Sequence, residues 1–393
     1  MVAEETSVTR INGSMSERLI TLRRDLHRRP ELSNHELATA ARIATELGAL
    51  GLTEIRQIAG TGLAVDVCGD SRGPLVVVRA DMDALPITED TRLPFASETP
   101  GVMHACGHDA HSAMAVGAAS LALDRPPAGT LRFVFQPAEE AEPLGGRRVV
   151  AEGALDGAIA AIALHVHPSL PTGTVGLRAG PSMASSDEFT ITVTGRAGHV
   201  GWPHEAVDAI AAATAIVVEL QTIVSRRTDP RTPITVHVGR IEGGSAGNVV
   251  ADTVVMTGTI RALSAGARAR AHELVGEVAS AVAAAHGARA EAEVVSGEPP
   301  LDNHPSVIDA FAAAAATGSV RRLPQPTMNS EDFAFYTERV PAGMAWLGVG
   351  GEDAAPLHHP RFTIDEAALP IGAALLYDTA CALLAAPPEL DRR

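Results

Sequence analysis

The chain has 393 residues, of which 46% are hydrophobic, and a formal net charge of −16 at neutral pH. Since single domains usually contain roughly 100–200 residues, this length predicts two domains with a sizeable core. The acidic balance argues against nucleic acid as a partner, because nucleic-acid binding rests on Lys and Arg side chains that neutralise phosphates.

Cysteine content and apolar segments indicate the compartment. Cys68, Cys106 and Cys381 are too few, and odd in number, for a disulfide framework, which fits a reducing cytoplasm. Residues 1–17 contain no apolar core of the kind found in a signal peptide. No stretch approaches ~20 strongly apolar residues, so we expect no membrane span, and the Ala-rich tract 209–220 is interpreted as a short buried helix.

In chain order, the first predicted elements are helices at 16–29 and 34–49, which Pro30 and Gly51 help to end. A continuous apolar run at 74–79 then predicts a strand buried on both faces, as in a mostly parallel sheet. The later elements of this part are a helix at 112–123, strands at 130–135, 159–164 (ending before His165) and 343–348, and a closing helix at 365–385. Alternating strands and helices indicate a layered α/β domain.

Between about 187 and 297 the strands alternate apolar and polar residues. This period of two is typical of antiparallel strands with one face open to water. Four such strands lie at 189–193, 234–238, 253–260 and 288–294, with helices at 205–226 and 265–286, the second capped by Ser264. The order strand, helix, strand, strand, helix, strand is that of a ferredoxin-like α+β fold. We therefore predict an α/β mixed-sheet domain formed by 1–186 and 298–393, with a domain at 187–297 inserted into it.

Polar clusters follow three of the predicted parallel strands. Asp81 and Asp83 follow the first, Glu139 and Glu140 the second, and His165 the third. In open α/β sheets, ligands bind outside the carboxyl ends of the strands. We therefore expect these clusters to meet near the segment HACGHDAH, which spans 104–111.

The segment HACGHDAH has three competing interpretations: a metal site, a cysteine nucleophile with a histidine base, or an ordinary polar loop. If the loop is extended, Cys106 and His108 point to the same side and could meet one cluster of borderline ions such as Zn. The nucleophile interpretation would pair Cys106 with His108 or His111, but it lacks the helix N-terminus that commonly lowers a cysteine pKa. A zinc deaminase site would need a Pro-Cys-x-x-Cys motif, which the chain does not contain.

The pair Glu139 and Glu140 is either a solvated acidic turn or a catalytic pair in which the two carboxylates have different roles. After a strand and Pro137 the backbone is expected to be extended, so the two side chains would point in opposite directions. One carboxylate could then bind a metal while the other serves as general base toward water. His358 and His359 lie between two prolines after the strand at 343–348, where they are either surface residues or part of the same site.

Nine blocks, in order along nearly the whole chain, carry a family resemblance. They are RRDLHRRPELSNHE (23–36), VVVRADMDALPITE (76–89), HACGHDAHSAM (104–114), FQPAEEA (135–141), LHVHP (164–168), GRAGHVGWPHEAVDAI (195–210), NVVAD (248–252), SEDFAFY (330–336) and LHHPRF (357–362). The chain resembles the metal-dependent N-acyl-amino-acid amidohydrolases, a group that includes hippurate hydrolase and auxin-conjugate hydrolases. They belong to the aminoacylase and carboxypeptidase clan of co-catalytic metallopeptidases.

The resemblance implies a catalytic metallopeptidase domain with an inserted lid domain, and it implies individual roles. Two divalent ions (Mn, Zn, Co or Ni) would be bound by Cys106, His108, Glu140, His165 and His358. Glu139 would be the general base, Asp83 would support the metal ligands, and His199 would hold the developing oxyanion. Asn248 and Arg261 would bind the substrate carboxylate.

The implied reaction is hydrolysis of the amide bond of an N-acyl amino acid by an activated water, in a cytoplasmic enzyme that forms a homodimer or higher homo-oligomer through the lid. Dipeptidase or carboxypeptidase-type peptide hydrolysis at the same site is the alternative. A cysteine hydrolase and a non-catalytic binding protein remain as hypotheses from other classes. Residues His27, Pro30 and Glu31 mark the family and are interpreted as structural, and no role is assigned to Ser330, Glu331 or Asp332.

Overall fold

The computed structural model describes residues 11–70, 73–315 and 319–389. The chain forms two compact units. The first consists of 1–180, 303–324 and 332–393, and the second of 181–302 and 325–331. The second unit is therefore an insertion in the sequence of the first. Two short strands at this junction, β7 (Gly180–Met183) and β14 (Leu301–Asn303), pair with each other.

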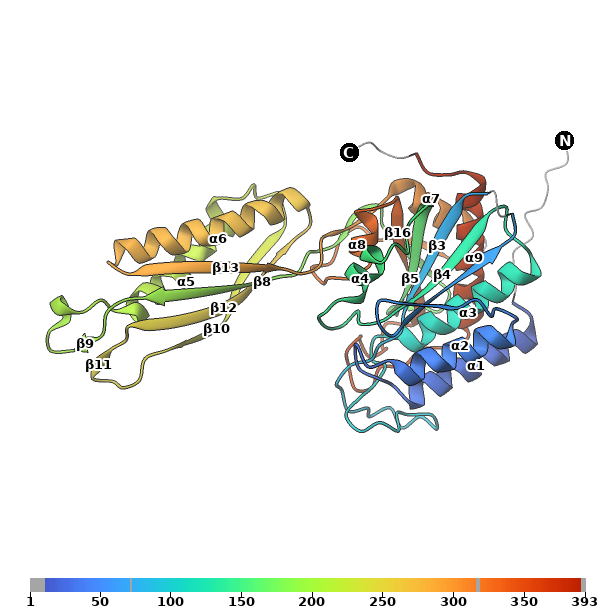
Figure 1. Ribbon diagram of the computed structural model, residues 1–393, viewed down its shortest axis with the longest axis horizontal. Coiled ribbons are helices and arrows are strands. Elements are labelled where there is room, and N and C mark those ends of the chain that lie inside the picture. The colour runs from blue at the N-terminus through green and yellow to red at the C-terminus, as the bar shows by residue number, and fades with distance from the viewer. Residues whose placement is uncertain (1–10, 71–72, 316–318, 390–393) are drawn as a thin grey trace. The chain divides into compact units, whose positions relative to one another are not determined.

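The first unit is built on an eight-stranded mixed sheet of order β1-β2-β4-β3-β5-β16-β6-β15 (Figure 1). In that order the strands are β1 (Arg56–Ile58), β2 (Gly62–Cys68), β4 (Thr130–Gln136), β3 (Leu75–Asp81), β5 (Ala158–Pro171), β16 (Ala342–Gly350), β6 (Val175–Leu177) and β15 (Val320–Arg322). The four central strands β4, β3, β5 and β16 are parallel, while β2 and β6 join them antiparallel. Their carboxyl ends therefore meet at one edge, as the sequence predicts.

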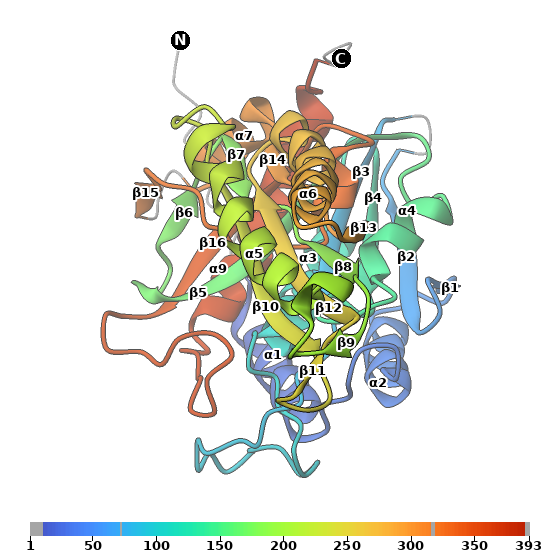
Figure 2. The same cartoon turned by 90° about the vertical axis from the view of Figure 1, so that its left-hand side faces the viewer.

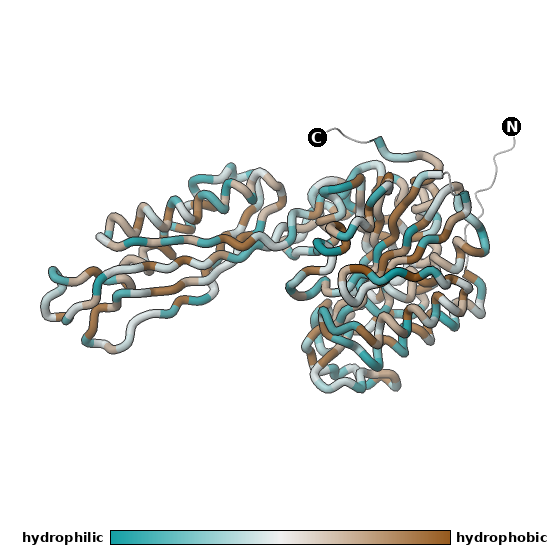
Figure 3. Tube along the Cα trace, in the orientation of Figure 1, coloured by the Kyte–Doolittle hydropathy of each residue, from teal (hydrophilic) through white to brown (hydrophobic). Residues whose placement is uncertain are grey.

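The central strands carry continuous apolar runs because both faces of the sheet are covered (Figure 3). In β3, residues Val76, Val77 and Val78 are all fully buried. The predicted strand at 159–164 is too short, since β5 continues through His165 to Pro171 and pairs with β16 along most of that length. His165 therefore lies within a strand rather than after one.

The helices of the first unit are α1 (Gly13–Arg28), α2 (Leu37–Ala49), α3 (His108–Asp124), α4 (Gly145–Ala151), α7 (Pro305–Ala314), α8 (Ala334–Thr337) and α9 (Ala368–Ala385). Helix α3 packs against α1, α9 and strand β3, so nearly every residue from His108 to Ala122 is buried. It begins four residues earlier than the predicted helix at 112–123. That shift places His108 in the first turn of a helix instead of in a loop.

A buried ion pair joins α1 to α3. The Arg23 guanidinium donates to Asp109 Oδ2 at 2.8 Å, and both side chains are 1% exposed. His27 Nδ1 lies 2.7 Å from the same oxygen. Burial works against the imidazolium, but the charge of Asp109 together with the hydrogen bonds to Asp109 and Glu89 outweighs it and raises the pKa of His27. The interpretation of His27 as structural agrees with these contacts.

Replacing Arg23 with Met is expected to lower the free energy of unfolding by about 3–5 kcal/mol, because it removes the guanidinium from the buried Asp109 carboxylate and leaves only His27 beside it. Urea denaturation followed by circular dichroism measures the effect. Arg24→Met is the matched control, since the neighbouring Arg24 is 42% exposed and its pair with Glu366 should contribute only about 0.2–1 kcal/mol. Equal losses in the two variants would contradict the argument.

The second unit is a four-stranded antiparallel sheet with two helices on one face (Figures 1 and 2). Its elements are β8 (Asp187–Thr194), α5 (Ala209–Arg226), β10 (Ile234–Gly243), β12 (Thr253–Ala262), α6 (Ala265–Ala285) and β13 (Arg289–Ser296), with the short β9 (Gly198–His199), β11 (Val249–Val250) and a 3-10 turn at Pro203–Glu205. The sheet order β10-β12-β8-β13 is the ferredoxin-like arrangement that the alternating pattern predicts. Ser264 caps α6 by accepting a hydrogen bond from Ala267 N–H.

Two helices, α5 and α9, are long and apolar enough to meet a length-and-composition criterion for a membrane span. Each packs into the core of its own unit. Only one face of α5 is buried, and Ile210, Val218 and Val224 on that helix are exposed. The prediction of a helix at 209–220 is therefore confirmed, but the prediction that this helix is buried holds for only one of its faces.

Candidate metal centre

Side chains from several elements converge at the carboxyl edge of the parallel strands in the first unit. Asp81 and Asp83 come at the end of β3, Glu139 and Glu140 follow β4, and His358 follows β16. His165 lies inside β5, Cys106 immediately precedes the N-cap of α3, and His108 is the first residue of α3. The structure thus brings together all five sequence-predicted ligands and the predicted base.

A sharp turn at Gly107 places Cys106 and His108 at the same site. Gly107 has a left-handed backbone (φ 84°, ψ 17°) and is the N-cap of α3, which begins at His108. The predicted extended loop is therefore wrong, although its consequence holds, because the turn and not a strand-like alternation directs both side chains to one cluster. Cys106 also stands immediately before a helix N-terminus, contrary to the sequence-based argument against the nucleophile interpretation.

Gly107→Ala is expected to destabilise the protein by more than the ~1–3 kcal/mol that a left-handed backbone costs other residues. A Cβ at this position would also lie 2.5 Å from Val166 Cγ2. Gly101→Ala is the matched control, since Gly101 has a similar φ of +79° but nothing within 4 Å of an added Cβ. Thermal denaturation of both variants separates the two contributions, and equal effects would show that the Val166 contact is unimportant.

His108 is oriented by Asp83. Its Nδ1 lies 3.1 Å from Asp83 Oδ1, while Asp83 Oδ2 accepts hydrogen bonds from Ser33 Oγ (2.6 Å) and Glu140 N–H (3.0 Å). Both oxygens of the Asp83 carboxylate are thereby engaged as acceptors, and His108 turns its other nitrogen, Nε2, toward the cluster. His108 Nε2 is buried and has no hydrogen-bond partner. A carboxylate on one nitrogen and a bare second nitrogen is the usual environment of a metal-ligating histidine.

The surroundings of His108 favour positive charge. Burial disfavours the imidazolium, but the charges of Asp81, Asp83 and Glu140 outweigh it and raise the pKa of His108 to about 10. Asp81 itself has a pKa well below its ordinary value, because the opposite charges around it outweigh its complete burial. A buried site with this excess of carboxylates is suited to hold a cation.

His165 is a neutral imidazole that is positioned to bind a metal through Nε2. Its Nδ1 donates to the Val166 carbonyl at 2.8 Å, and its Nε2 lies 3.5 Å from Cys106 Sγ. Complete burial holds the pKa of His165 well below its ordinary value. The Nε2 lone pair therefore faces the thiol of Cys106 and is available to a metal.

Glu139 and Glu140 approach the same cluster, so the prediction that they point in opposite directions is wrong. Ala138 before them is left-handed (φ 49°), and residues 139 and 140 form a bend rather than an extended segment. One carboxylate oxygen of each lies within 4.8 Å of a His108 nitrogen. Glu140 Oε1 is buried and accepts no hydrogen bond, although His358 Nε2 is 3.3 Å away.

His358 reaches this cluster from the loop after β16. Its backbone is left-handed (φ 61°), and its N–H donates to the Ala105 carbonyl at 2.9 Å, one residue before Cys106. The side chain is 52% exposed, so this side of the cluster is open to solvent. The neighbouring His359 instead accepts a hydrogen bond from Arg361 N–H within its own loop, as expected for a residue outside the ligand set.

The donor atoms fit a pair of divalent ions. Cys106, His108 and His165 form one group and Cys106, Glu140 and His358 another, and within each group the donor atoms lie within 4.8 Å of one another. Zn–N and Zn–S bonds of about 2.0–2.3 Å put two ligands of one ion up to about 4.6 Å apart, so each group needs only small side-chain movements to close on one ion. With the bare atoms His108 Nε2 and Glu140 Oε1 facing inward, these residues could hold two divalent ions.

His111 has both nitrogens occupied. Its Nδ1 lies 2.6 Å from Asp81 Oδ1, and its Nε2 accepts a hydrogen bond from Val166 N–H at 2.9 Å. It can therefore be neither a metal ligand nor the base of a cysteine nucleophile. His108 keeps a free Nε2 beside its Asp83 partner, so this contact does not exclude it as such a base. The contacts of His111 therefore remove one of the two histidines that the cysteine-hydrolase hypothesis names.

The other three predicted site residues belong to the second unit. His199 is exposed in β9, where its Nδ1 accepts a hydrogen bond from Gly201 N–H, and its ring lies 5.4 Å from that of Trp202. Asn248 is exposed just before β11, a strand that pairs with β9. Arg261 in β12 donates to the Met328 carbonyl at 3.3 Å. The structure places His199 and Asn248 on one two-stranded ribbon and Arg261 on the main sheet.

Sequence reasoning missed the residues that support the cluster. Glu36 is fully buried and accepts hydrogen bonds from Ala138 N–H and Thr61 Oγ1, which fixes the backbone just before Glu139. Ser33, which donates to Asp83, and His111, which accepts from Val166 N–H, likewise support the cluster. Ser33 and Glu36 lie in the block 23–36, which carries part of the family resemblance. Only the fold shows which side chains of that block face the cluster.

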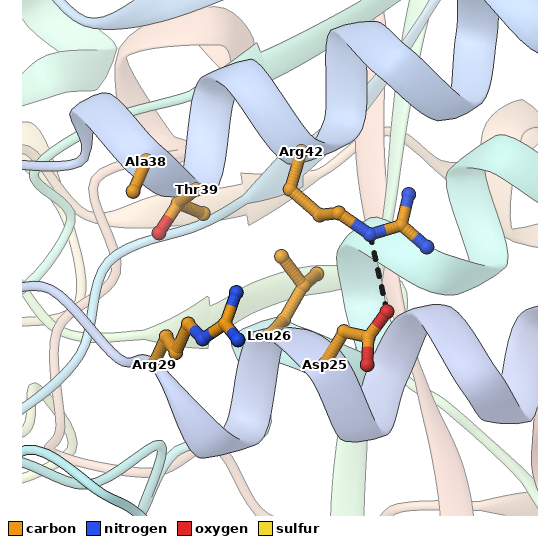
Figure 4. A pocket seen from close by; sticks show the side chains of 6 residues that line it. All are labelled: Asp25, Leu26, Arg29, Ala38, Thr39 and Arg42. Atoms are coloured by element: carbon orange, nitrogen blue, oxygen red, sulfur yellow. Dashed lines mark hydrogen bonds and ion pairs between the residues drawn. The ribbon is translucent and has the colours of Figure 1, made fainter.

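A separate pocket lies between α1 and α2 (Figure 4). It has a volume of about 260 Å³ and is lined by Asp25, Leu26, Arg29, Ala38, Thr39 and Arg42. Its one carboxylate, Asp25, is paired with Arg42 at 3.2 Å. The lining contains no histidine or cysteine, so this pocket lacks the residue types of the metal centre.

Comparison with known proteins gives concordant results. The model of Peptidase family M20/M25/M40 matches residues 77–382. The chain is 41% identical over 376 residues to the N-acetyl-L-cysteine deacetylase of Bacillus subtilis, covering 95% of this chain and 89% of that protein. It is 35% identical over 366 residues to thermostable carboxypeptidase 2 of Saccharolobus solfataricus, covering 90% and 92% of the two chains.

A solved Bacillus subtilis structure, described as a dinuclear metal-binding peptidase of the M20 family, superposes with a TM-score of 0.86 at 36% identity, covering 96% of this chain and all of that one. These findings confirm the family resemblance, the fold class and the assignment as an enzyme. The chain belongs to Peptidase family M20/M25/M40 and is a metal-dependent amidohydrolase.

Proposed function

We propose that this enzyme hydrolyses the amide bond of N-acyl amino acids, such as N-acetyl or N-benzoyl conjugates, and releases a carboxylic acid and a free amino acid. The observation that carries the proposal is the convergence of Cys106, His108, Glu140, His165 and His358 beside Glu139. The similarity to an N-acetyl-L-cysteine deacetylase supports the choice of substrate class.

Two divalent ions per subunit would be held by the five converging ligands. The donor set combines a thiolate, three imidazoles and a carboxylate, which suits Zn, Co, Ni or Mn. When bound, such ions lower the pKa of a water toward about 7 and polarise the substrate carbonyl. Asp83 would keep the His108 tautomer in which Nε2 is free to bind.

Glu139 would act as general base and then as general acid. It would take the proton of the attacking water, and it would pass this proton to the nitrogen of the leaving amino acid. Because Glu140 of the same bend is assigned to a metal, the two adjacent glutamates have different tasks. The side chains proposed to bind the substrate are His199 as oxyanion donor, and Asn248 and Arg261 for the substrate carboxylate.

Peptide hydrolysis of the carboxypeptidase or dipeptidase type is the alternative at the same centre, and the similarity to thermostable carboxypeptidase 2 favours it. Initial rates with N-acetylcysteine, other N-acetyl and N-benzoyl amino acids, indole-acyl amino acids and dipeptides decide between the two. Each ion (Mn, Zn, Co or Ni) is added separately. We expect the highest kcat/KM for an N-acyl amino acid. Higher values for dipeptides would support the alternative, and no turnover on the panel would count against both.

We also propose a cytoplasmic enzyme that forms a homodimer or higher homo-oligomer through the second unit. The exposed apolar residues Val200, Trp202, Ile241 and Val249 in that unit support this proposal. Light scattering after gel filtration measures the assembly, and a monomer at micromolar concentration would contradict it. Recovery of the enzyme in the membrane fraction of its source cells would contradict the proposed location.

A further inference from the structure

We infer that His111 is a positioning residue, which holds the Val166 peptide and thereby aims His165 Nε2 at the metal centre. The inference rests on the proposed ligand role of His165, and it adds a function for a histidine that is not itself a ligand. His111 is 2% exposed and Val166 is fully buried. Their contacts are therefore isolated from water.

Both polar backbone groups of Val166 are engaged by imidazoles. Its N–H donates to His111 Nε2 at 2.9 Å, and its carbonyl accepts from His165 Nδ1 at 2.8 Å. A histidine that is bonded through Nδ1 can direct only Nε2 at a metal. Because the Val166 carbonyl fixes the His165 ring, any shift of Val166 would move the ligand atom.

Geometry determines the tautomer of His111. A backbone N–H can only donate, so His111 Nε2 must be unprotonated and Nδ1 must carry the proton. That proton points to Asp81 Oδ1, 2.6 Å away. His111 is thus a neutral side chain whose acceptor faces Val166 and whose donor faces a buried carboxylate.

A buried chain of charged side chains holds Asp81 on the side away from His111. Arg79 donates to Asp81 Oδ2 at 2.6 Å and to Asp332 Oδ1 at 2.8 Å. Asp332 also accepts from Gln136 Nε2 and from Gly146 N–H. Asp332, which had no assigned role in the sequence, therefore ends a buried chain that runs through Arg79, Asp81 and His111 to the peptide next to His165.

Packing fixes the same peptide from a second side. The rings of His111 and His165 lie 4.5 Å apart, and the Val166 side chain sits against Gly107, where an added Cβ would be only 2.5 Å from Val166 Cγ2. Burying Asp81, Arg79 and Asp332 costs desolvation that apolar residues of similar size would avoid. Positioning of a ligand is a role that apolar residues could not perform.

The test compares two partial mimics of His111. His111→Asn keeps a donor near the Nδ1 position for Asp81 but cannot reach Val166. His111→Gln keeps an acceptor near the Nε2 position for Val166. We expect the Asn variant to bind one Co²⁺ ion about 10–100-fold more weakly than the wild type and the Gln variant to recover most of that loss. His111→Phe keeps the ring volume without any acceptor, and it replaces the Asn variant if that protein does not fold.

Binding is measured with the metal-depleted proteins by equilibrium dialysis against Co²⁺ and elemental analysis. The near-ultraviolet absorption of the Co²⁺–thiolate pair reports the ion that contacts Cys106. His104→Gln is the matched control, because His104 is a buried histidine of the same segment whose nitrogens have no hydrogen-bond partner. Circular dichroism verifies that each variant is folded.

Wild-type Co²⁺ affinity in the folded Asn or Phe variant would overturn the inference and leave the proposed function intact. An equal loss in the Gln and Asn variants, or in His104→Gln, would also overturn it, since the effect would then be general damage to the core. A wild-type protein that binds no ion would overturn the proposed function and this inference together.

Discussion

Glu139→Gln is expected to lower kcat for N-acyl amino acid hydrolysis by about 10⁴-fold, while both metal ions remain bound. General acid–base catalysis typically contributes about 10²–10⁴-fold, and the upper limit applies here because the base and acid steps use the same carboxylate. Gln has nearly the same size and shape as Glu but cannot take up a proton. Steady-state kinetics with N-acetylcysteine and elemental analysis of the purified variant measure the two quantities.

The metal content of the variant must be measured, because Glu139 lies in the same group of potential ligands as His108 and Glu140. Loss of an ion together with activity would show that Glu139 is a ligand and not the base. Glu142→Gln is the matched control, since Glu142 is an exposed residue of the same loop whose carboxylate accepts from Leu144 N–H, a contact that Gln can keep. Normal turnover in Glu139→Gln would refute the assignment.

Metal removal is expected to have the second large effect. Dialysis against a chelator should abolish turnover, and Mn, Zn, Co or Ni should restore it, because no side chain of the cluster can by itself polarise an amide carbonyl as a divalent ion does. A cysteine hydrolase would retain its activity in the chelator. Activity measured before chelation, after chelation and after each metal is returned decides between these mechanisms.

Chelation should also lower the melting temperature, because a ligand that binds only the folded state stabilises it by about 2.7 kcal/mol at 100 times its Kd. Glu139→Gln provides the control, since its ligands are intact and its melting temperature should fall by the same amount. An unchanged melting temperature in both proteins would mean that the five converging side chains do not bind ions in solution.

Periodicity predicted the architecture well. The continuous apolar run at 74–79 indicated a strand covered on both faces, and β3 is indeed parallel to β4 and β5. Strict alternation between 187 and 297 indicated antiparallel strands, and all pairs within the four-stranded sheet are antiparallel. Both predictions succeeded because the burial of one or two faces is recorded directly in the order of apolar residues.

Local backbone conformation at the site was predicted poorly. The sequence predicts extended segments around Gly107 and Ala138, but both residues are left-handed. Gly adopts this conformation freely, so Gly107 gave a weak signal, whereas Ala138 gave none. The alanine is held by the buried Glu36 carboxylate, a partner 102 residues away, which no local pattern could reveal.

By itself, the sequence determined the order of the elements, the edge of the sheet at which polar residues gather, and the set of side chains able to bind a metal. The tertiary structure alone decided how those side chains are aimed. Asp83 and the Val166 carbonyl select the free nitrogens of His108 and His165, and the bend at Ala138 brings Glu139 and Glu140 to one side. The physical reason is that repeating apolar patterns express burial, which is local in sequence, whereas the direction of a ligand depends on hydrogen bonds between segments that only folding brings together.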